Sequence, residues 1–215
     1  MCVIWFSYVS INGDIIMNIY DFDGTIYDGD SSVDFFKFCL RKNKKIYLLF
    51  PGILLYFILF LLKIKTKEEF KSKYFSFLKC FEDIDEVVNE FWDKNLYKIK
   101  KFYLDKKNNT DIIISASPEF LLKPVSKKLK FKLIATKVDK KNGLFLGKNC
   151  YGKEKVKRLN KINIYDCLEF YSDSLSDIYL VKIAKKAFIV KGDEIINFND
   201  YKEPLMHKIK KFIFK

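Results

Sequence analysis

Short apolar runs alternate along the chain with longer segments in which apolar residues recur at helical spacing. Five runs have the length and residue types of buried strands, at residues 17–20, 112–114, 131–136, 168–171 and 187–190. The longest helical segment, residues 28–109, lies between the first two runs. Strands that alternate with helices predict an α/β fold: a Rossmann-like parallel sheet flanked by helices, with an inserted helical subdomain.

Local signals mark where several helices begin. Ser31 with Asp34, and Thr66 with Glu69, have the spacing of capping boxes within the insertion. Beyond the insertion the sequence predicts an N-cap at Ser117, a hairpin turn at residues 142–143 and a helix at about residues 153–161. The insertion is therefore expected to be helical, and strands and helices to alternate after it.

Residues 46–62 form the longest uncharged run, with lysines on both flanks and Pro51–Gly52 inside it. Seventeen residues are at the lower limit of what spans a bilayer. A single crossing would put the strands before and after the run on opposite sides of the membrane, which one sheet does not allow. We expect either a helical element packed within the insertion or one that dips into a membrane interface without crossing.

The composition narrows the chemistry. A chain of 215 residues with 49% apolar residues is long enough for one α/β unit with an insertion. Its five cysteines are scattered and odd in number, which fits neither a disulfide framework nor a zinc site and favours a reducing, cytoplasmic compartment. The single histidine, His207, argues against serine–histidine triads and multi-histidine metal sites. Catalysis would have to use carboxylates, hydroxyls and lysine.

The net charge of +13 would attract anions of several kinds. Arg41 and Arg158 are the only arginines, whereas nucleic-acid recognition usually relies on guanidinium groups. Most of the charge is explained by a lysine-rich composition on a solvated surface. We therefore expect no nucleic-acid partner, and keep open a peripheral contact with an anionic membrane.

Residues 1–16 precede the first predicted strand. Their apolar run lacks the basic leader and the small-residue cleavage site of a signal peptide. Because the strand is complete from Met17, we expect these residues to be a dispensable extension, with the start at either Met1 or Met17.

Two carboxylates follow the first strand in the run Asp21-Phe22-Asp23-Gly24-Thr25. Side chains alternate along a strand, so Asp21 and Asp23 should point to one side and Phe22 to the other. Gly24 would let the chain turn away at the carboxyl edge of the sheet, where α/β proteins bind ligands. The arrangement suits a nucleophile beside a proton donor; the alternative is an Asp–Gly turn with solvated acids.

A second acidic pair, Asp173 and Asp177, follows the strand predicted at residues 168–171. Four carboxylates at one sheet edge would repel each other unless a cation lay between them. An all-oxygen set of ligands favours Mg²⁺. The alternative for this pair alone is N-capping of the next helix.

Two further elements supply groups that bind phosphate. Ser115 follows the strand at residues 112–114, and its hydroxyl and the next backbone N–H, that of Ala116, are placed to hold phosphate oxygens. Lys155 or Lys153, in the helix expected at residues 153–161, would neutralise charge near Asp21. With 40 basic residues in the chain, a solvated lysine is the alternative for either one.

In this order, the motifs resemble those of haloacid dehalogenase-like phosphatases, over about residues 17–191. The stretch 149–159, after the predicted hairpin, resembles the subgroup that contains phosphoserine phosphatases and bacterial phosphatidylglycerophosphate phosphatases, subfamily IB. The resemblance implies a catalytic core at residues 17–27 and 110–215 and a helical cap at residues 28–109. It also implies a phosphatase that works through an aspartyl-phosphate intermediate.

The resemblance assigns a role to each matching residue. Asp21 is the nucleophile, Asp23 the acid and base, and Lys155 the charge-stabilising group, with Lys153 as the other possibility. Phosphate is held by Ser115 and Ala116, with Thr25 from the first motif. The Mg²⁺ ligands come from Asp21, Asp23, through its carbonyl, and Asp173, with Asp177 behind them.

The substrate stays open between two classes. In phosphoserine phosphatases the residue nine positions after the nucleophile is glutamate, whereas here it is Asp30. The apolar segment at residues 46–62 is unexpected for a polar amino-acid substrate and favours a lipid phosphate such as phosphatidylglycerophosphate. A small soluble phosphate, a phosphotransferase reaction, and a non-catalytic protein of the membrane surface are the competing interpretations. The oligomeric state is not predicted.

Overall fold

The computed structural model describes residues 17–201. Residues 1–16, His207 and the basic tail at 208–215 lie outside the described residues, so the expectation that residues 1–16 are dispensable stays a prediction. Met17 is 5% exposed and packs under the sheet, directly before the first strand.

A six-stranded sheet forms the centre of the molecule, in the order β3-β2-β1-β4-β5-β6. The strands are β1 (Asn18–Tyr20), β2 (Ile112–Pro118), β3 (Lys132–Thr136), β4 (Cys167–Ser172), β5 (Ala184–Lys191) and β6 (Glu194–Asn197). The first five are parallel, and β6 pairs antiparallel with β5. The predicted α/β fold is confirmed, and β6 is an addition that the hydrophobic pattern did not indicate.

Alternate residues of β1 face the two layers of the protein. Ile19 pairs with Ile112 and Phe170, and all three belong to a core under α7 and α8. Tyr20 faces the other way, where its ring stacks on that of Tyr171 with centroids 4.8 Å apart. The sheet is thus buried on both faces, as its apolar strands require.

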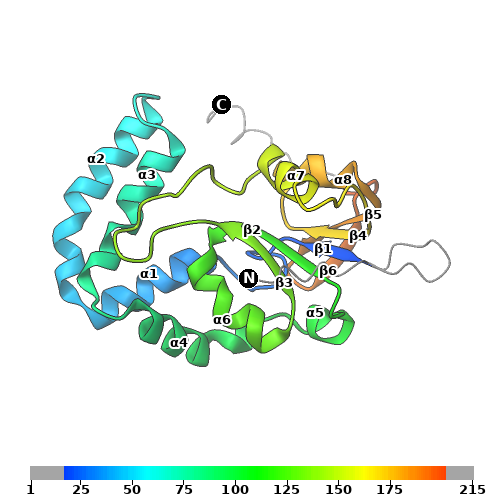
Figure 1. Ribbon diagram of the computed structural model, residues 1–215, viewed down its shortest axis with the longest axis horizontal. Coiled ribbons are helices and arrows are strands. Elements are labelled where there is room, and N and C mark those ends of the chain that lie inside the picture. The colour runs from blue at the N-terminus through cyan, green and yellow to red at the C-terminus, as the bar shows by residue number, and fades with distance from the viewer. Residues whose placement is uncertain (1–16, 202–215) are drawn as a thin grey trace, which may run out of the picture.

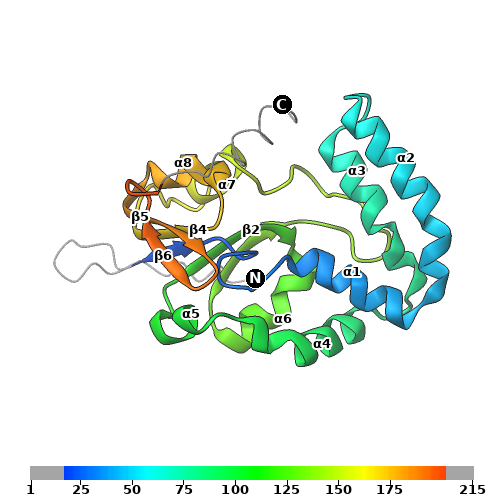
Figure 2. The same cartoon turned by 180° about the vertical axis from the view of Figure 1, so that it is seen from behind.

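Helices cover each face of the sheet (Figures 1 and 2). On one side lie α7 (Lys153–Asn160) and α8 (Ile178–Val181), and on the other lie α5 (Lys101–Lys106) and α6 (Glu119–Leu129). Tyr103 of α5 contacts the ring of Tyr20, with centroids 5.1 Å apart. These helices enclose the strands and leave the carboxyl edge of the sheet open to the rest of the insertion.

The insertion between β1 and β2 is helical, as the spacing predicted. It contains α1 (Ser31–Lys42), α2 (Phe50–Leu61), α3 (Lys67–Tyr74), α4 (Ile84–Asn95) and α5, with short 3-10 helices at Lys44–Leu49, Phe75–Cys80 and Leu96–Lys98. In both views α2 and α3 lie side by side at the end of the molecule opposite β6 (Figures 1 and 2). The division into core and cap at residues 28–109 stays a prediction.

Two of the predicted helix starts need correction. The N-cap of α1 is Asp30, whose side chain accepts a hydrogen bond from Val33 N, so the proposed Ser31 and Asp34 box is wrong by one residue. The box at Thr66 and Glu69 is confirmed. The N-cap of α6 is Pro118 and not Ser117, because the Ser117 hydroxyl donates to a carboxylate elsewhere in the fold.

The hairpin predicted at residues 142–143 is confirmed and reaches toward the insertion. Val138 bridges Phe145 in antiparallel fashion, and Gly143 N donates to Asp139 O at 2.8 Å. Gly143 has φ +80°, and a Cβ there would lie 2.3 Å from the carbonyl oxygen of Phe75. The hairpin therefore packs directly on the insertion, and glycine allows that close approach.

Trp92 of α4 connects the insertion to α6. It is fully buried, and its indole N–H donates to Leu121 O at 2.6 Å. We predict that Trp92→Phe lowers the free energy of unfolding by about 2 kcal/mol, because it loses this hydrogen bond and leaves a small cavity. Urea denaturation measures the change. Tyr97→Phe, at a side chain 80% exposed, is the control and should change stability by less than about 0.5 kcal/mol. Equal stability of the two variants would contradict the prediction.

Candidate active site

Asp21 and Asp23 lie at the carboxyl end of β1, on the side predicted for them. Asp21 N donates to Tyr171 O at 2.9 Å, which ties the end of β1 to β4. Phe22 is fully buried and packs edge-on against Trp92, with ring centroids 5.9 Å apart. The buried aromatic ring between them fixes both carboxylates toward the open edge of the sheet.

Lys155 joins the two acidic pairs. Its ammonium lies 2.9 Å from Asp21 Oδ1 and 2.7 Å from Asp177 Oδ2, and the side chain is 2% exposed. Burial works against the charged ammonium, but the carboxylates of Asp21 and Asp177 outweigh it and raise the pKa of Lys155. Lys155 is therefore charged and held beside the predicted nucleophile.

The other candidate, Lys153, lies elsewhere. Its ammonium is 5.1 Å from the ring centroid of Tyr179, and its side chain is exposed. The two lysines begin the same helix, α7, but only Lys155 points into the fold. Of the two lysines left open by the sequence, Lys155 is the one that reaches Asp21.

Asp23 is surrounded by hydroxyl and amide donors. Oδ1 accepts from Ser31 N at 2.6 Å, and Oδ2 accepts from the Ser117 hydroxyl at 2.5 Å and the Ser115 hydroxyl at 3.5 Å. Burial, and then the negative charge of Asp30, raise the pKa of Asp23 to about 6, while the hydrogen bonds from Ser117 and Ser31 act the other way. Asp23 is thus a carboxyl group suited to exchanging a proton near neutral pH.

Asp173 is held by its backbone against the first motif. Its N–H donates to Thr25 Oγ1 at 2.9 Å, and its carbonyl oxygen accepts from the Lys191 ammonium. Gly24 has φ +71°, and a Cβ there would lie 2.4 Å from Asp173 Oδ2. Thr25, predicted to bind phosphate, is fully buried and uses its hydroxyl for Asp173.

The acidic residues fit a divalent cation. Asp177 Oδ1 is buried without a hydrogen-bond partner, and burial followed by the charge of Asp177 are among the effects that raise the pKa of Asp173. Within residues 17–201 no three acidic, histidine or cysteine side chains converge into a ready-made metal cage. Mg²⁺ does not need one, because it is usually held by one or two carboxylates with water and phosphate oxygens. Asp21, Asp173 and the Asp23 carbonyl are consistent with that mode.

A cavity of about 470 Å³ opens onto these residues. Its walls come from the loop after β1, the start of α1, α3, the end of β2, α7 and the loop after β4. They include Asp21, Asp23, Asp30, Phe70, Lys71, Tyr74, Ala116, Ser117, Lys155 and Asp173. Ser115 lies just beneath the wall, fully buried, and its hydroxyl accepts from Ser117 N at 3.0 Å. Of the predicted phosphate-binding residues, Ala116 therefore lines the cavity directly.

Lys71 is a site residue that the sequence did not reveal. It comes from α3 of the insertion, and its ammonium lies 3.4 Å from both Ala116 O and Asn149 Oδ1. Burial, and then the neighbouring charge of Lys67, lower the pKa of Lys71 to about 8. Its only signal was a place between Phe70 and Tyr74 in a short helix rich in lysine, which does not distinguish it from its neighbours.

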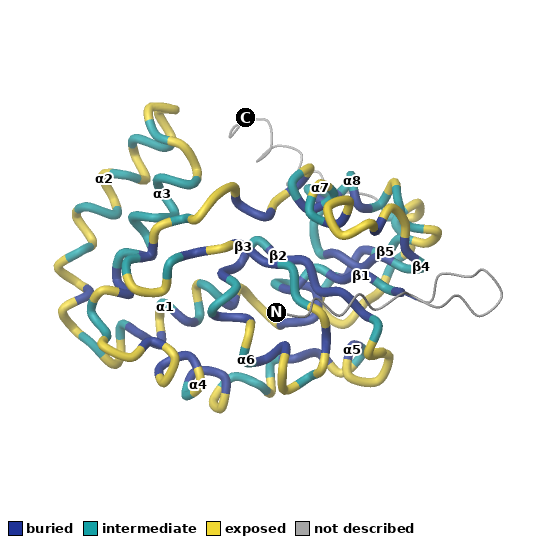
Figure 3. Tube along the Cα trace, viewed as in Figure 1, coloured by how far each residue is buried: buried dark blue, intermediate teal, exposed yellow. Residues whose placement is uncertain are grey.

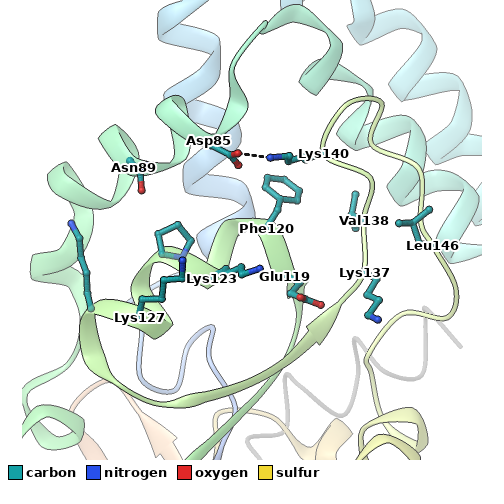
Figure 4. Close-up of a pocket in the computed structure, with 12 residues that line it drawn as sticks. Asp85, Asn89, Glu119, Phe120, Lys123, Lys127, Lys137, Val138, Lys140 and Leu146 are labelled. Carbon is teal, nitrogen blue, oxygen red and sulfur yellow. Dashed lines mark hydrogen bonds and ion pairs between the residues drawn. The ribbon is translucent and has the colours of Figure 1, made fainter. Parts of the chain in front are cut away.

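A second cavity, of about 730 Å³, is lined by other residues than Asp21, Asp23, Asp173 and Asp177 (Figure 4). It is lined by α4, α6 and the hairpin after β3, with Lys123, Lys127 and Lys137 around it and Lys140 paired with Asp85. The lysines here are exposed and surround no nucleophile or acid pair. The chemistry therefore belongs to the smaller cavity.

Several solved structures resemble the fold of this protein. The structure resembles a protein of unknown function from Bordetella pertussis Tohama I, with a TM-score of 0.66 and 16% identity, covering 93% of this chain and 96% of that one. It also resembles a probable phosphoserine phosphatase from Vibrio cholerae, with a TM-score of 0.51 and 10% identity, covering 80% and 55%. A phosphoserine phosphohydrolase-like protein from Francisella tularensis gives a TM-score of 0.50 and 16% identity, covering 80% and 86%.

At these identities the neighbours show a shared fold. No curated protein matches the sequence. The family model of haloacid dehalogenase-like hydrolases matches residues 19–182, which span both acidic motifs, Lys155 and the whole insertion. The chain therefore belongs to the haloacid dehalogenase-like hydrolase family.

Proposed function

We propose that this protein is a Mg²⁺-dependent phosphomonoester hydrolase that acts through an aspartyl-phosphate intermediate. The observation that carries the proposal is the buried Lys155 ammonium bridging Asp21 and Asp177 next to the cavity. Burial raises the pKa of Asp21 to about 8, and the Lys155 ammonium acts against that shift and so favours the carboxylate form. The carboxyl group faces a space where a phosphate ester fits. The phosphoserine phosphatase-like neighbours support the same class of reaction.

The proposed reaction has two steps. In the first, an Asp21 oxygen forms a bond to phosphorus while the bond from phosphorus to the ester oxygen breaks, and Asp23 gives its proton to the leaving alcohol. In the second, Asp23 takes a proton from water, which attacks the phosphorus and releases inorganic phosphate and Asp21. Lys155 stabilises negative charge throughout.

Asp21, Asp173 and the Asp23 carbonyl would hold Mg²⁺, which when bound supplies positive charge beside the phosphoryl oxygens. Asp177 would act behind these ligands: its Oδ2 accepts from the Lys155 ammonium and from the Ser172 hydroxyl at 3.0 Å, and its Oδ1 is left for water next to the metal. We assign the helical insertion the role of a cap that encloses the substrate and excludes water.

Within this class we favour a lipid phosphate, such as phosphatidylglycerophosphate, over phosphoserine. Val33, Phe70 and Phe75 give the cavity an apolar side, which suits the apolar part of a lipid better than the charged groups of phosphoserine. The protein would then work at the cytoplasmic face of an anionic membrane. A small soluble phosphate ester is the second candidate, supported by the polar wall at Asp23 and Ser117.

The nucleophile is tested by Asp21→Asn. We predict that phosphate release falls by at least about a thousandfold, because the amide cannot attack phosphorus, while the melting temperature stays close to that of the native protein. Asp28→Asn, an exposed acid of the same loop, is the control and should keep full activity. Native activity should also disappear with EDTA and return with Mg²⁺. Turnover by Asp21→Asn at the native rate would rule out the proposed mechanism.

The contact between Gly24 and Asp173 gives a test of the metal site. Gly24→Ala would push the Asp173 carboxylate away, so we predict at least about a tenfold rise in the Mg²⁺ concentration needed for half-maximal activity. Gly192→Ala is the matched control: φ is +58° there, but a Cβ would meet nothing within 4 Å. If both variants need the same Mg²⁺ concentration as the native protein, Asp173 does not bind the metal.

Lys71 is predicted to bind an anionic group of the substrate. Lys71→Met keeps the length of the side chain and removes the charge, so KM should rise about tenfold with a smaller change in kcat. Lys73→Met is the control on the same helix, since the Lys73 ammonium points toward the Tyr56 ring of α2. Steady-state kinetics separates the two constants, and an unchanged KM in Lys71→Met would exclude this role.

A further inference from the structure

Helix α2 exposes an apolar face. No residue of α2 is buried, although its sequence from Phe50 to Leu61 contains no charged or strongly polar side chain except the Tyr56 hydroxyl (Figure 3). The outward side chains Leu54, Leu55 and Leu61 are 59%, 53% and 48% exposed. Such a contiguous apolar surface on a protein with a net charge of +13 indicates a binding site and not a solvated face.

The outer face is defined here as Leu54, Leu55, Ile58 and Leu61 of α2, Leu62 at its C-cap and Leu48 of the preceding 3-10 helix, all of them exposed. The four residues of α2 lie on successive turns of one side of the helix. The other side packs on α3, where the ring of Phe70 contacts Phe57 and Phe60 at centroid distances of 5.4 and 5.7 Å. The outer face is therefore not a packing surface for any described part of the chain.

Positive charges border the outer face at both ends. Lys44 and Lys45 precede it and Lys63 follows it, all exposed, and no acidic residue occurs between Lys44 and Lys67. An anionic surface would be attracted to both ends at once. A second copy of the chain would bring lysines against lysines if the two helices packed antiparallel about a two-fold axis, so the charge pattern favours lipid over self-association.

The fold indicates that α2 lies in the membrane interface without crossing it. The stretch Lys44–Leu61 has the length and composition of a membrane span, and 6% of it is buried inside the protein. However, the chain turns back at Leu62 into α3, whose sequence contains Glu68, Glu69 and three lysines. So polar a helix, packed along α2, would not enter the hydrocarbon region.

The same helix pair leads to the active site. Phe70 contacts Phe57 and Phe60 of α2 and also lines the cavity that holds Asp21. Lys71, the next residue, extends into that cavity. Apolar side chains are therefore in contact from α2 through Phe70 to the edge of the cavity, where Lys71 supplies positive charge.

We propose that the outer face of α2 docks on an anionic lipid surface, with Lys44, Lys45 and Lys63 at the headgroups. The substrate, a phosphomonoester carried by a lipid, enters past Phe70 with its phosphate toward Asp21. The docking is independent of the reaction, whereas the entry route depends on the proposed phosphatase function.

The docking is tested with vesicles of phosphatidylcholine alone and with equal parts of phosphatidylglycerol. The full-length protein should sediment with the anionic vesicles and be released at about 1 M salt, where charges are screened within about 3 Å. Leu54→Gln with Leu61→Gln should weaken binding by at least about tenfold, because two large apolar side chains no longer enter the interface. Leu104→Gln with Ile162→Gln, exposed side chains on other elements, is the matched control and should bind as the native protein does.

Two double variants test whether the lysines beside α2 contribute to binding. Lys44→Gln with Lys63→Gln should reduce binding to anionic vesicles by about fivefold per lysine, whereas Lys137→Gln with Lys157→Gln removes the same charge elsewhere and should have little effect. Equal losses in both pairs would mean attraction through net charge alone and would overturn the assignment to α2. The assignment would also be overturned if the native protein formed a dimer and did not bind vesicles, and if that dimer were lost in Leu54→Gln with Leu61→Gln.

Activity separates the docking from the reaction. On a soluble aryl phosphate the α2 variants should keep the native rate, and on a lipid phosphomonoester in vesicles they should lose at least about tenfold, in line with their binding. Equal rates on the lipid for native and variant protein would overturn the entry route. If the native protein binds vesicles but hydrolyses neither ester, the phosphatase proposal fails and the docking stands. If it hydrolyses the aryl phosphate but ignores vesicles, the docking fails and the phosphatase proposal stands.

Discussion

The site depends on one buried charge, the ammonium of Lys155. Asp21 and Asp177 come from β1 and from the loop after β4, and each would be costly to bury as a lone carboxylate. The ammonium lies within 3 Å of both, so the three groups neutralise much of each other's charge and fix the end of β1 against α7 and the loop after β4. Asp173 is held separately, because its N–H donates to Thr25 Oγ1 and its carbonyl oxygen accepts from the Lys191 ammonium.

The insertion has two sides with different physical roles. Its inner side is packed with aromatic rings, including Trp92 and Phe91 of α4, which anchor it to α6 and to Phe22. Its outer side, at α2, is apolar and exposed. Phe70 links the two sides, because it lines the cavity and its ring contacts Phe57 and Phe60 of α2. We infer that the same helix pair both encloses the site and determines what reaches it.

Much of the site could be predicted because strands fix side-chain direction. The spacing of Asp21 and Asp23 placed both carboxylates on one side, and the run at residues 112–114 placed Ser115 at the same edge. Helix starts were less certain, since Asp30 caps α1 where Ser31 was expected, and Ser117 uses its hydroxyl for Asp23 instead of capping α6. A serine or aspartate near a helix start has several possible partners, and local sequence cannot choose among them.

The sequence by itself determined the α/β fold, the helical insertion and the order of the acidic motifs, because all three follow from local periodicity and residue type. Only the tertiary structure decided that Lys155 and not Lys153 reaches Asp21, that Lys71 of the insertion enters the cavity, and that one side of α2 faces outward. Each of these depends on which side of a helix meets a segment far away in the chain. That choice is made by packing between distant segments, which no local pattern contains.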